Sequence, residues 1–195
     1  MIVGVLLAAG RGRRFGADKL AAKLQGRAVI RWSAEALARH VERLYVVVPL
    51  GTNTAMRALS KLDPCFVENW ARDEGMASSI RAGVEAMPDD VEAIVLALAD
   101  QPLVSPDTVR ALIDRWHRGD VAAVAPAYRN GRGHPVLFGR ECFAALAALH
   151  GDVGARGVLE ALGNRLALIE VDADVPLDVD TPDDLHEIVG TLSNE

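Results

Sequence analysis

The sequence predicts an α/β protein in which a largely parallel sheet lies between two layers of helices. Short, continuous apolar runs recur along the 195 residues, as expected for strands that are buried on both faces. Segments with apolar residues at helical spacing separate most of these runs, which is typical of parallel strands joined by crossover helices. The length suits one sizeable core, so we expect a single domain over residues 1–195.

Strands and helices alternate regularly in the first half of the chain. The first apolar run, IVGVLL, covers residues 2–7, and the strongest run, AIVLAL, covers 93–98 and leads directly to Asp100. Ser105 is the expected N-cap of a helix whose first position is Pro106. The expected strands are 2–7, 44–48, 65–67 and 93–98, and the expected helices are 29–39, 52–62, 75–87 and 106–117.

The second half is less regular. Residues 130–133, with the sequence NGRG, predict a tight turn between two strands. Thr181 is the expected N-cap of the last helix, because acidic residues follow it in what would be the first turn. The expected strands are 121–125, 135–138 and 166–171, and the expected helices are 141–149, 155–162 and the segment after Thr181.

Composition excludes several kinds of protein. The net charge is −6, and an acidic protein lacks the basic surface on which general binding to nucleic acid or acidic membranes depends. Cys65 and Cys142 fit no metal-site spacing, and a disulfide between them is open but not required. The apolar run 2–9 is too short to span a membrane. We therefore expect a cytoplasmic protein with no nucleic-acid and no membrane partner.

A glycine-rich, arginine-rich loop follows the first expected strand, within the stretch LLAAGRGRRFGADKL at residues 6–20. Glycines allow backbone N–H groups to approach phosphate oxygens, although a flexible basic turn is the simpler alternative. The spacing G-x-G-x-x-x-G differs from the dinucleotide-binding fingerprint and from the P-loop. Ligands of parallel sheets bind at the carboxyl ends of strands, so this loop and Asp100 should open on one crevice. Cations beside a carboxylate suit a metal-bound polyphosphate.

This loop resembles the signature of the nucleotidyltransferases related to molybdenum-cofactor guanylyl- and cytidylyltransferases. The match covers Leu7-Ala-Ala-Gly10 and the later positions Gly12, Arg14, Gly16 and Lys19, with Phe15 where methionine is commonest. Five further segments are similar to family motifs in the same order, namely 74–83 (EGMASSIRAG), 98–102 (LADQP), 133–135 (GHP), 151–156 (GDVGAR) and 178–185 (DVDTPDDL). The resemblance spans essentially the whole chain and implies a Rossmann-like three-layer α/β/α nucleotidyltransferase fold.

The resemblance also implies roles for individual residues. Arg14, Lys19 and Asp100 would be catalytic, and Mg²⁺ would lie on Asp100 and a second carboxylate. Asp178 and Asp180 are both candidates for this second carboxylate, because side chains two positions apart in an extended segment point to the same side, and the family pattern favours Asp180. The nucleotide-binding set is Leu7, Ala8, Ala9, Gly10, Gly12, Arg14, Lys19, Gly75 and Ser78, and the acceptor-binding set is Ser79, Arg81, Gln101, His134, Asp152 and Arg156.

Simpler interpretations stand beside several of these roles. Asp100 could merely cap the turn before Ser105, and Ser78 or Ser79 could cap a helix. The same helix start, with free N–H groups and Arg81, could also form a second anion pocket. Asp152 and Arg156 could form an i,i+4 ion pair on a helix. A lone histidine such as His134 is more often structural than catalytic, and no zinc-ligand spacing includes it.

The resemblance implies a magnesium-dependent transferase that moves CMP from CTP to molybdopterin or molybdenum cofactor and releases pyrophosphate. Gln101 and the segment 75–79 favour the cytidylyl branch. A molybdenum hydroxylase or its maturation factor would then be a transient partner. The alternatives are a GTP-using enzyme, a transferase for another phosphorylated acceptor, and a non-catalytic cofactor carrier. A nicotinamide-dependent oxidoreductase is disfavoured by the glycine spacing.

Overall fold

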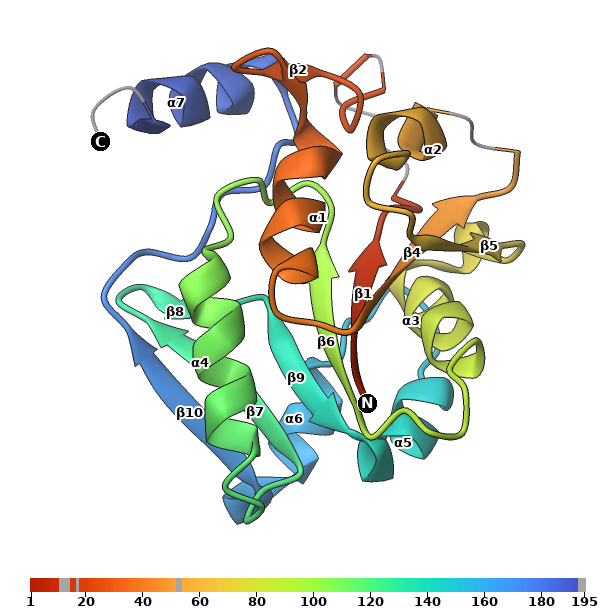
Figure 1. Ribbon diagram of the computed structural model, residues 1–195, viewed down its shortest axis with the longest axis vertical. Coiled ribbons are helices and arrows are strands. Elements are labelled where there is room, and N and C mark those ends of the chain that lie inside the picture. Colours follow the sequence, from red (N-terminus) through yellow and green to blue (C-terminus); the bar gives the residue numbers. More distant parts are fainter. Residues whose placement is uncertain (11–14, 17, 52–53, 193–195) are drawn as a thin grey trace.

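The computed structural model describes residues 1–10, 15–16, 18–51 and 54–192. A central sheet carries helices on both faces, as the sequence predicts (Figure 1). Its strands are β1 (Ile2–Leu7), β4 (Arg43–Pro49), β5 (Cys65–Asn69), β6 (Ala93–Leu98), β7 (Ala123–Tyr128), β8 (Gly131–Arg132), β9 (Val136–Gly139) and β10 (Leu166–Val171). The helices are α1 (Val29–Ala38), α2 (Thr54–Leu59), α3 (Met76–Glu85), α4 (Pro106–Trp116), α5 (Phe143–Ala147), α6 (Arg156–Ala161) and α7 (Pro182–Leu192).

The sheet has eight strands and is mostly parallel. The order is β10-β7-β9-β6-β1-β4-β5, and β8 pairs with β7. The parallel pairs are β1 with β4, β1 with β6, β4 with β5 and β10 with β7, whereas β9 runs antiparallel to both of its neighbours. The predicted α/β/α fold with a mostly parallel sheet is therefore confirmed.

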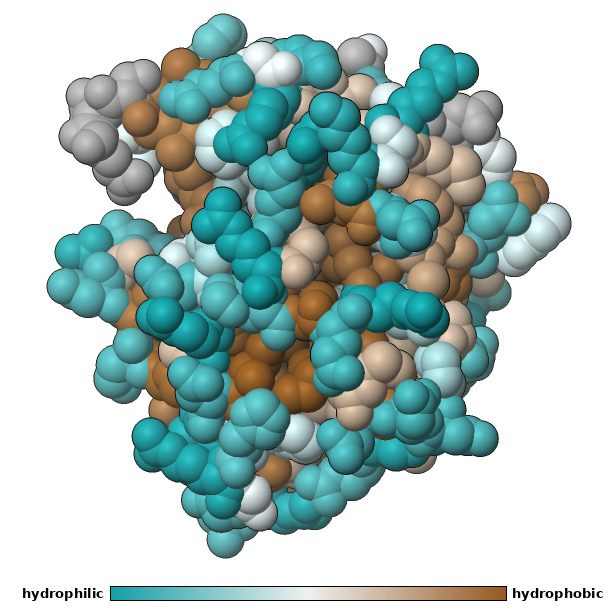
Figure 2. Space-filling model, viewed as in Figure 1, coloured by the Kyte–Doolittle hydropathy of each residue, from teal (hydrophilic) through white to brown (hydrophobic). Residues whose placement is uncertain are grey.

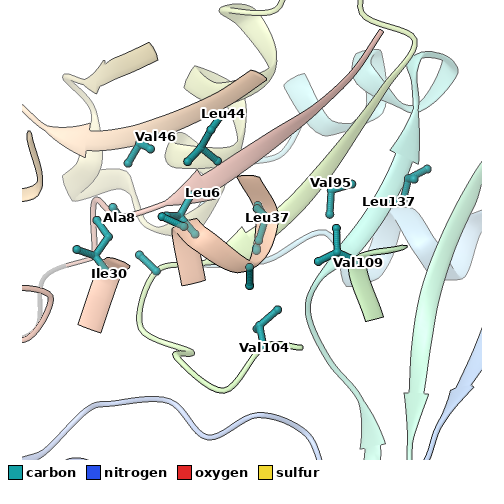
Figure 3. Close-up of a cluster of buried hydrophobic side chains, with 14 of the residues drawn as sticks. Leu6, Ala8, Ile30, Leu37, Leu44, Val46, Val95, Val104, Val109 and Leu137 are labelled. Atoms are coloured by element: carbon teal, nitrogen blue, oxygen red, sulfur yellow. The ribbon is translucent and has the colours of Figure 1, made fainter. Parts of the chain in front are cut away.

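Alternating side chains of β1 supply both halves of the core. Leu6 and Ala8 pack in a cluster with α1 and α4, while Val5 and Leu7 pack on the opposite face with α3 and α5. Figure 3 shows the first cluster, in which Leu37 of α1 lies beside Leu6. Burial on both faces fixes β1 and β6 as a rigid frame for the loops that follow them.

Hydrophilic side chains cover much of the face that carries α1 and α4 (Figure 2). Hydrophobic side chains show in the middle, below α1 and beside α4, and also at the upper right near α2 and β4. No helix within the described ranges combines the length and apolar character needed to cross a membrane. Cys65 and Cys142 are both free thiols, so the disulfide that the sequence leaves open is not formed.

Three strand predictions, 2–7, 93–98 and 166–171, match the structure at both ends. The predicted strand 121–125 instead covers Ala123–Tyr128, and the predicted helix 141–149 is a 3₁₀ turn, η2 (Arg140–Cys142), followed by α5. The structure also contains a small hairpin that was not predicted, formed by β2 (Lys23–Leu24) and β3 (Arg27–Ala28). Its turn has positive φ at Gln25 and Gly26. Helix α7 packs against this hairpin through Ile188 and Leu24.

Candidate active site

A cavity of about 490 Å³ opens at the carboxyl ends of β1 and β6. Leu7 and Leu98 are paired in register, so the loops after these two strands begin side by side. Backbone bonds extend the pairing beyond the strands, from Ala99 N to Leu7 O at 3.0 Å and from Ala8 N to Val47 O at 2.8 Å. The lining residues are Leu7, Ala8, Ala9, Gly10, Lys19, Leu20, Arg72, Asp73, Glu74, Gly75, Met76, Ser79, Leu98, Asp100 and Asp152.

Lys19 lines this cavity and joins two carboxylates from distant parts of the chain, Asp100, which also lines it, and Asp180, which is not among the lining residues. Lys19 Nζ donates to Asp100 Oδ2 at 2.7 Å and to Asp180 Oδ1 at 2.8 Å. The segment that carries Asp180 is held in place by Val179 N, which donates to Asp100 O at 2.9 Å. Burial lowers the pKa of the Lys19 ammonium, but the two carboxylates outweigh burial and hold that pKa above its usual value.

Asp178 and Asp180 have different partners, although the sequence leaves both open as the second metal ligand. Asp178 Oδ1 accepts a hydrogen bond from Gln101 Nε2 at 2.8 Å, and burial raises the pKa of this carboxyl group. Gln101 is itself buried, and its Oε1 has no hydrogen-bond partner in the described part of the chain. The geometry therefore brings Asp180, rather than Asp178, to Asp100 and Lys19.

The donor set at Asp100 and Asp180 fits a hard divalent cation. Magnesium in phosphate-transfer sites takes one or two carboxylates and completes its shell with phosphate oxygens and water. The described residues hold no group of three or more acidic, histidine or cysteine side chains that could bind a metal without a substrate. Four carboxylates line the cavity with only Lys19 and Arg72 as described cations, so a polyphosphate would need further positive charge there.

A buried asparagine that the sequence analysis missed organises the segment between β5 and α3. Asn69 Nδ2 donates to Ser78 Oγ at 2.9 Å and to Ser79 Oγ at 3.0 Å, while its Oδ1 accepts from Ala71 N at 2.9 Å. Ser78 Oγ in turn donates to Gly75 O at 2.8 Å. Neither serine caps α3 with its side chain, so the expected capping role is wrong. The signal in the sequence that could have identified Asn69 is its position as a polar residue at the end of the apolar strand β5.

The start of α3 does not have the free N–H groups that its sequence suggested. Met76 N donates to Asp152 Oδ1 at 3.3 Å, and Ala77 N donates to Gly151 O at 3.2 Å. Gly75 has a φ of +96°, and a Cβ there would lie 2.7 Å from Asp152 Cα. The loop 151–152 therefore packs over the helix start and occupies it with a carboxylate, which corrects the expectation of a second anion pocket there.

Four of the predicted acceptor residues do not line this cavity, namely Arg81, Gln101, His134 and Arg156. Arg81 donates to Glu74 Oε2 at 2.7 Å and to Leu149 O at 3.2 Å. Arg156 is exposed and pairs with Glu160 at 2.8 Å at i,i+4 spacing. The alternative pair of Asp152 with Arg156 is wrong, because Asp152 precedes α6 and contacts α3 instead.

His134 is half-buried near Asp100 and is not among the cavity-lining residues. Burial lowers the pKa of its imidazole to about 4, although the Asp100 carboxylate acts in the opposite direction. The imidazole is therefore neutral at pH 7. The backbone carbonyl of His134 accepts a hydrogen bond from Tyr128 Oη at 2.8 Å.

Gly12 and Arg14, both predicted to bind phosphate, lie outside the described residues.

Comparison with known proteins identifies relatives along the full length of the chain. It is 33% identical to nicotine blue oxidoreductase of Paenarthrobacter nicotinovorans, with 96% of each chain covered. It is 30% identical to purine catabolism protein PucB of Bacillus subtilis, with 98% of each covered. Identity to the molybdenum cofactor cytidylyltransferase of Escherichia coli is 23%, covering 92% of this chain and 91% of that protein.

Solved structures agree with these relatives. The homologue of Mycobacterium tuberculosis Rv0371c from Mycobacterium sp. strain JC1 has a TM-score of 0.84 at 33% identity, covering 99% of this chain and 97% of that one. A manganese complex of Rv0371c itself has a TM-score of 0.79 at 31% identity, covering 97% of this chain and 98% of that one. The model of the MobA-like NTP transferase domain matches residues 4–166. The chain therefore belongs to the MobA-like NTP transferase family and is a nucleotidyltransferase.

Proposed function

We propose that this enzyme transfers CMP from CTP to the terminal phosphate of a molybdopterin-type acceptor, with Mg²⁺ as cofactor and pyrophosphate as the second product. The observation that carries the proposal is the convergence of Asp100 and Asp180 on Lys19, where Lys19 and Asp100 line the cavity at the ends of β1 and β6 and Asp180 adjoins them. A carboxylate pair and a lysine at one cavity suit a metal-bound nucleoside triphosphate.

Asp100 and Asp180 would hold the metal, which supplies charge neutralisation at the α-phosphate when bound. The acceptor phosphate is already ionised at neutral pH, so no strong general base is required. An acceptor oxygen forms a bond to the α-phosphorus, the bond from that phosphorus to the bridging oxygen breaks, and the electron pair leaves with pyrophosphate. The protein contributes mainly positioning and electrostatic stabilisation.

Lys19 would neutralise the phosphates of the nucleotide and of the departing pyrophosphate. It is buried, and its ammonium already lies between the two carboxylates, so a small change of partner would bring it to a phosphate oxygen. Arg14 would act with it from the preceding loop. Leu7, Ala8, Ala9, Gly10 and Gly75 line the cavity and would contact the nucleotide.

The acceptor would lie toward Ser79, Asp152 and the side of Asp100 on which Gln101 and His134 stand. The Gln101 amide oxygen is buried without a partner among described residues, so it could accept a hydrogen bond from a bound pterin. Ser78 supports the nucleotide segment through Asn69 and Gly75 rather than by facing the cavity. Arg81 and Arg156 would influence the acceptor only indirectly.

The choice of CTP is supported by the cytidylyl-type segment 74–83, by Gln101 and by the similarity to the Escherichia coli cytidylyltransferase. GTP is the main rival, because probable molybdenum cofactor guanylyltransferases of Thermococcus species are 26–27% identical over about two thirds of both chains. Manganese is a second metal to test, given the manganese complex of the mycobacterial homologue. The product would pass to a molybdenum hydroxylase or its maturation factor through a transient contact.

A pyrophosphate-release panel tests this proposal. Four NTPs are each assayed with and without molybdopterin, with Mg²⁺ or Mn²⁺, and we expect release only with CTP and acceptor together. Release with GTP alone among the four would identify the guanylyl rival, and a non-catalytic carrier would release none. Because a 33% identical relative is named an oxidoreductase, NADH and NADPH oxidation is assayed in parallel and should not occur.

A further inference from the structure

Arg72 is a cation of the cavity wall that the sequence motifs did not identify. The other charged side chains that line the cavity all have a partner. Lys19 pairs with Asp100 and Asp180, and Glu74 pairs with Arg81. Asp152 accepts a hydrogen bond from Met76 N, and Asp73 also has an interaction partner. Arg72 has no ion pair with any described residue, and its Nε is buried without a hydrogen-bond partner there.

The segment that carries Arg72 is held firmly at the cavity wall. Arg72 begins the 3₁₀ turn η1 (Arg72–Glu74), which lies between β5 and α3. The buried Asn69 bonds to Ala71 N at one end of the turn and to both serines of α3 beyond its other end. Gly75 N closes the turn by donating to Arg72 O at 3.3 Å. Such support pre-positions a side chain for a ligand.

We infer that Arg72 binds a phosphate group of a substrate. A half-buried guanidinium that has no counter-ion within the described ranges is costly, and an anion in the cavity would compensate it. Its planar fork of N–H donors matches the oxygens of a phosphate. Two substrates carry such a group, the nucleoside triphosphate and the acceptor. The inference rests on the proposal that both bind in this cavity, but it holds whichever NTP is used.

The test compares Arg72→Gln with Arg118→Gln in the full-length enzyme. Arg118 is exposed, follows the C-terminal end of α4 and is not among the cavity-lining residues, and its replacement makes the same charge change. Calorimetry measures the Kd of CTP, of cytidine and of inorganic pyrophosphate, and steady-state assays measure the acceptor KM. Arg72→Lys keeps the charge but loses the planar arrangement of guanidinium N–H donors. Thermal melting checks the fold of each variant.

We expect Arg72→Gln to weaken the binding of one phosphate-bearing substrate about tenfold or more relative to Arg118→Gln, while the Kd of cytidine stays unchanged. Binding of that substrate to Arg72→Lys should be intermediate. A raised Kd for CTP and pyrophosphate identifies the nucleotide as the source, and a raised acceptor KM alone identifies the acceptor. CTP Kd, pyrophosphate Kd and acceptor KM all within about twofold of the Arg118→Gln values would overturn the inference. Equal weakening of cytidine would also overturn it, by indicating a purely structural role.

Failure of the proposed function gives a different result. If the parent enzyme releases pyrophosphate with GTP and not with CTP, the cytidylyl assignment fails, and the Arg72 comparison is read with GTP and guanosine. If no NTP supports turnover, calorimetric Kd values for inorganic pyrophosphate and for molybdopterin decide on Arg72, because neither measurement needs turnover. Values for both ligands within about twofold of those of Arg118→Gln would then overturn the inference.

Discussion

Lys19 Nζ lies 2.7 Å from Asp100 Oδ2, and this partly buried charged hydrogen bond joins the loop after β1 to the segment that follows β6. Asp180 accepts from the same ammonium at 2.8 Å. The ammonium therefore occupies the carboxylate oxygens at which we propose that a divalent cation binds. Metal binding there would make the affinity for the metal depend on the position of Lys19.

Removal of Lys19 should strengthen metal binding in the absence of nucleotide while it impairs turnover. In Lys19→Met, two carboxylates lose their resident cation, so we expect Mn²⁺ to bind about tenfold more tightly than to the parent protein. Calorimetry or electron paramagnetic resonance measures this affinity. Lys61→Met at an exposed position is the charge-matched control. Equal or weaker Mn²⁺ binding in Lys19→Met would contradict competition for the same oxygens.

Replacement by asparagine should distinguish the roles of Asp100, Asp178 and Asp180 by its effect on kcat. We expect Asp100→Asn and Asp180→Asn to lower kcat by about a hundredfold or more, because an amide is a poor ligand for magnesium. Asp178→Asn should cost much less, since Asp178 bonds to Gln101 rather than to Lys19. The measurement is kcat at saturating Mg²⁺, with melting temperature as the check on folding. A near-parental rate for Asp100→Asn would exclude it as an essential ligand.

Gly75 should tolerate no side chain. A Cβ at this position would lie 2.7 Å from Asp152 Cα and from Gly151 O, and its φ of +96° is strained for any other residue. We expect Gly75→Ala to lower the free energy of unfolding in urea by about 1–3 kcal/mol. Gly157→Ala is the control, because Gly157 lies in α6 with open space around it, and it should be neutral or stabilising. Equal stabilities of the two variants would refute the close packing of loop 151–152 on α3.

His134 should titrate well below ordinary histidines, since burial lowers the pKa of its imidazole to about 4. The unfolded chain takes up this proton near pH 6.5, so the free energy of unfolding should fall as pH drops from about 6.5 to 4. We expect this residue to contribute about 1–2 kcal/mol to the loss between pH 7 and pH 5. NMR titration, with His134→Asn to assign the signal, measures the pKa. A midpoint near 6.5 would show that the imidazole is not desolvated.

Strand positions were predictable where continuous apolar runs carry the signal, as in β1 and β6. The expected strand 121–125 stops before Pro126, a residue type that is rare inside central strands, whereas β7 continues through it to Tyr128. The structure explains this difference. Antiparallel β9 pairs only with Ala123 and Val124, so it requires no N–H from Pro126.

The approach of Lys19 to Asp100 was expected, because the loops at the carboxyl ends of neighbouring strands open on one crevice. Asp180 was expected beside Asp100 only because the family resemblance favours it as the second metal ligand. The support of that crevice was not predictable from spacing. Asp152 reaches α3 across 76 positions, and no local pattern in the sequence indicates this contact. Arg72 was missed for a similar reason, since the absence of a partner for it among the described residues becomes visible only once those residues are placed.

The central claim is that the cavity takes CTP rather than GTP. Base choice should depend on buried hydrogen-bond groups that the wrong base leaves unpaired, each at a cost of about 1–3 kcal/mol. The most direct measurement is kcat/KM for CTP and for GTP, with the same molybdopterin acceptor and Mg²⁺. We predict a CTP preference of about ten- to a hundredfold. Equal values, or a preference for GTP, would contradict the cytidylyl assignment.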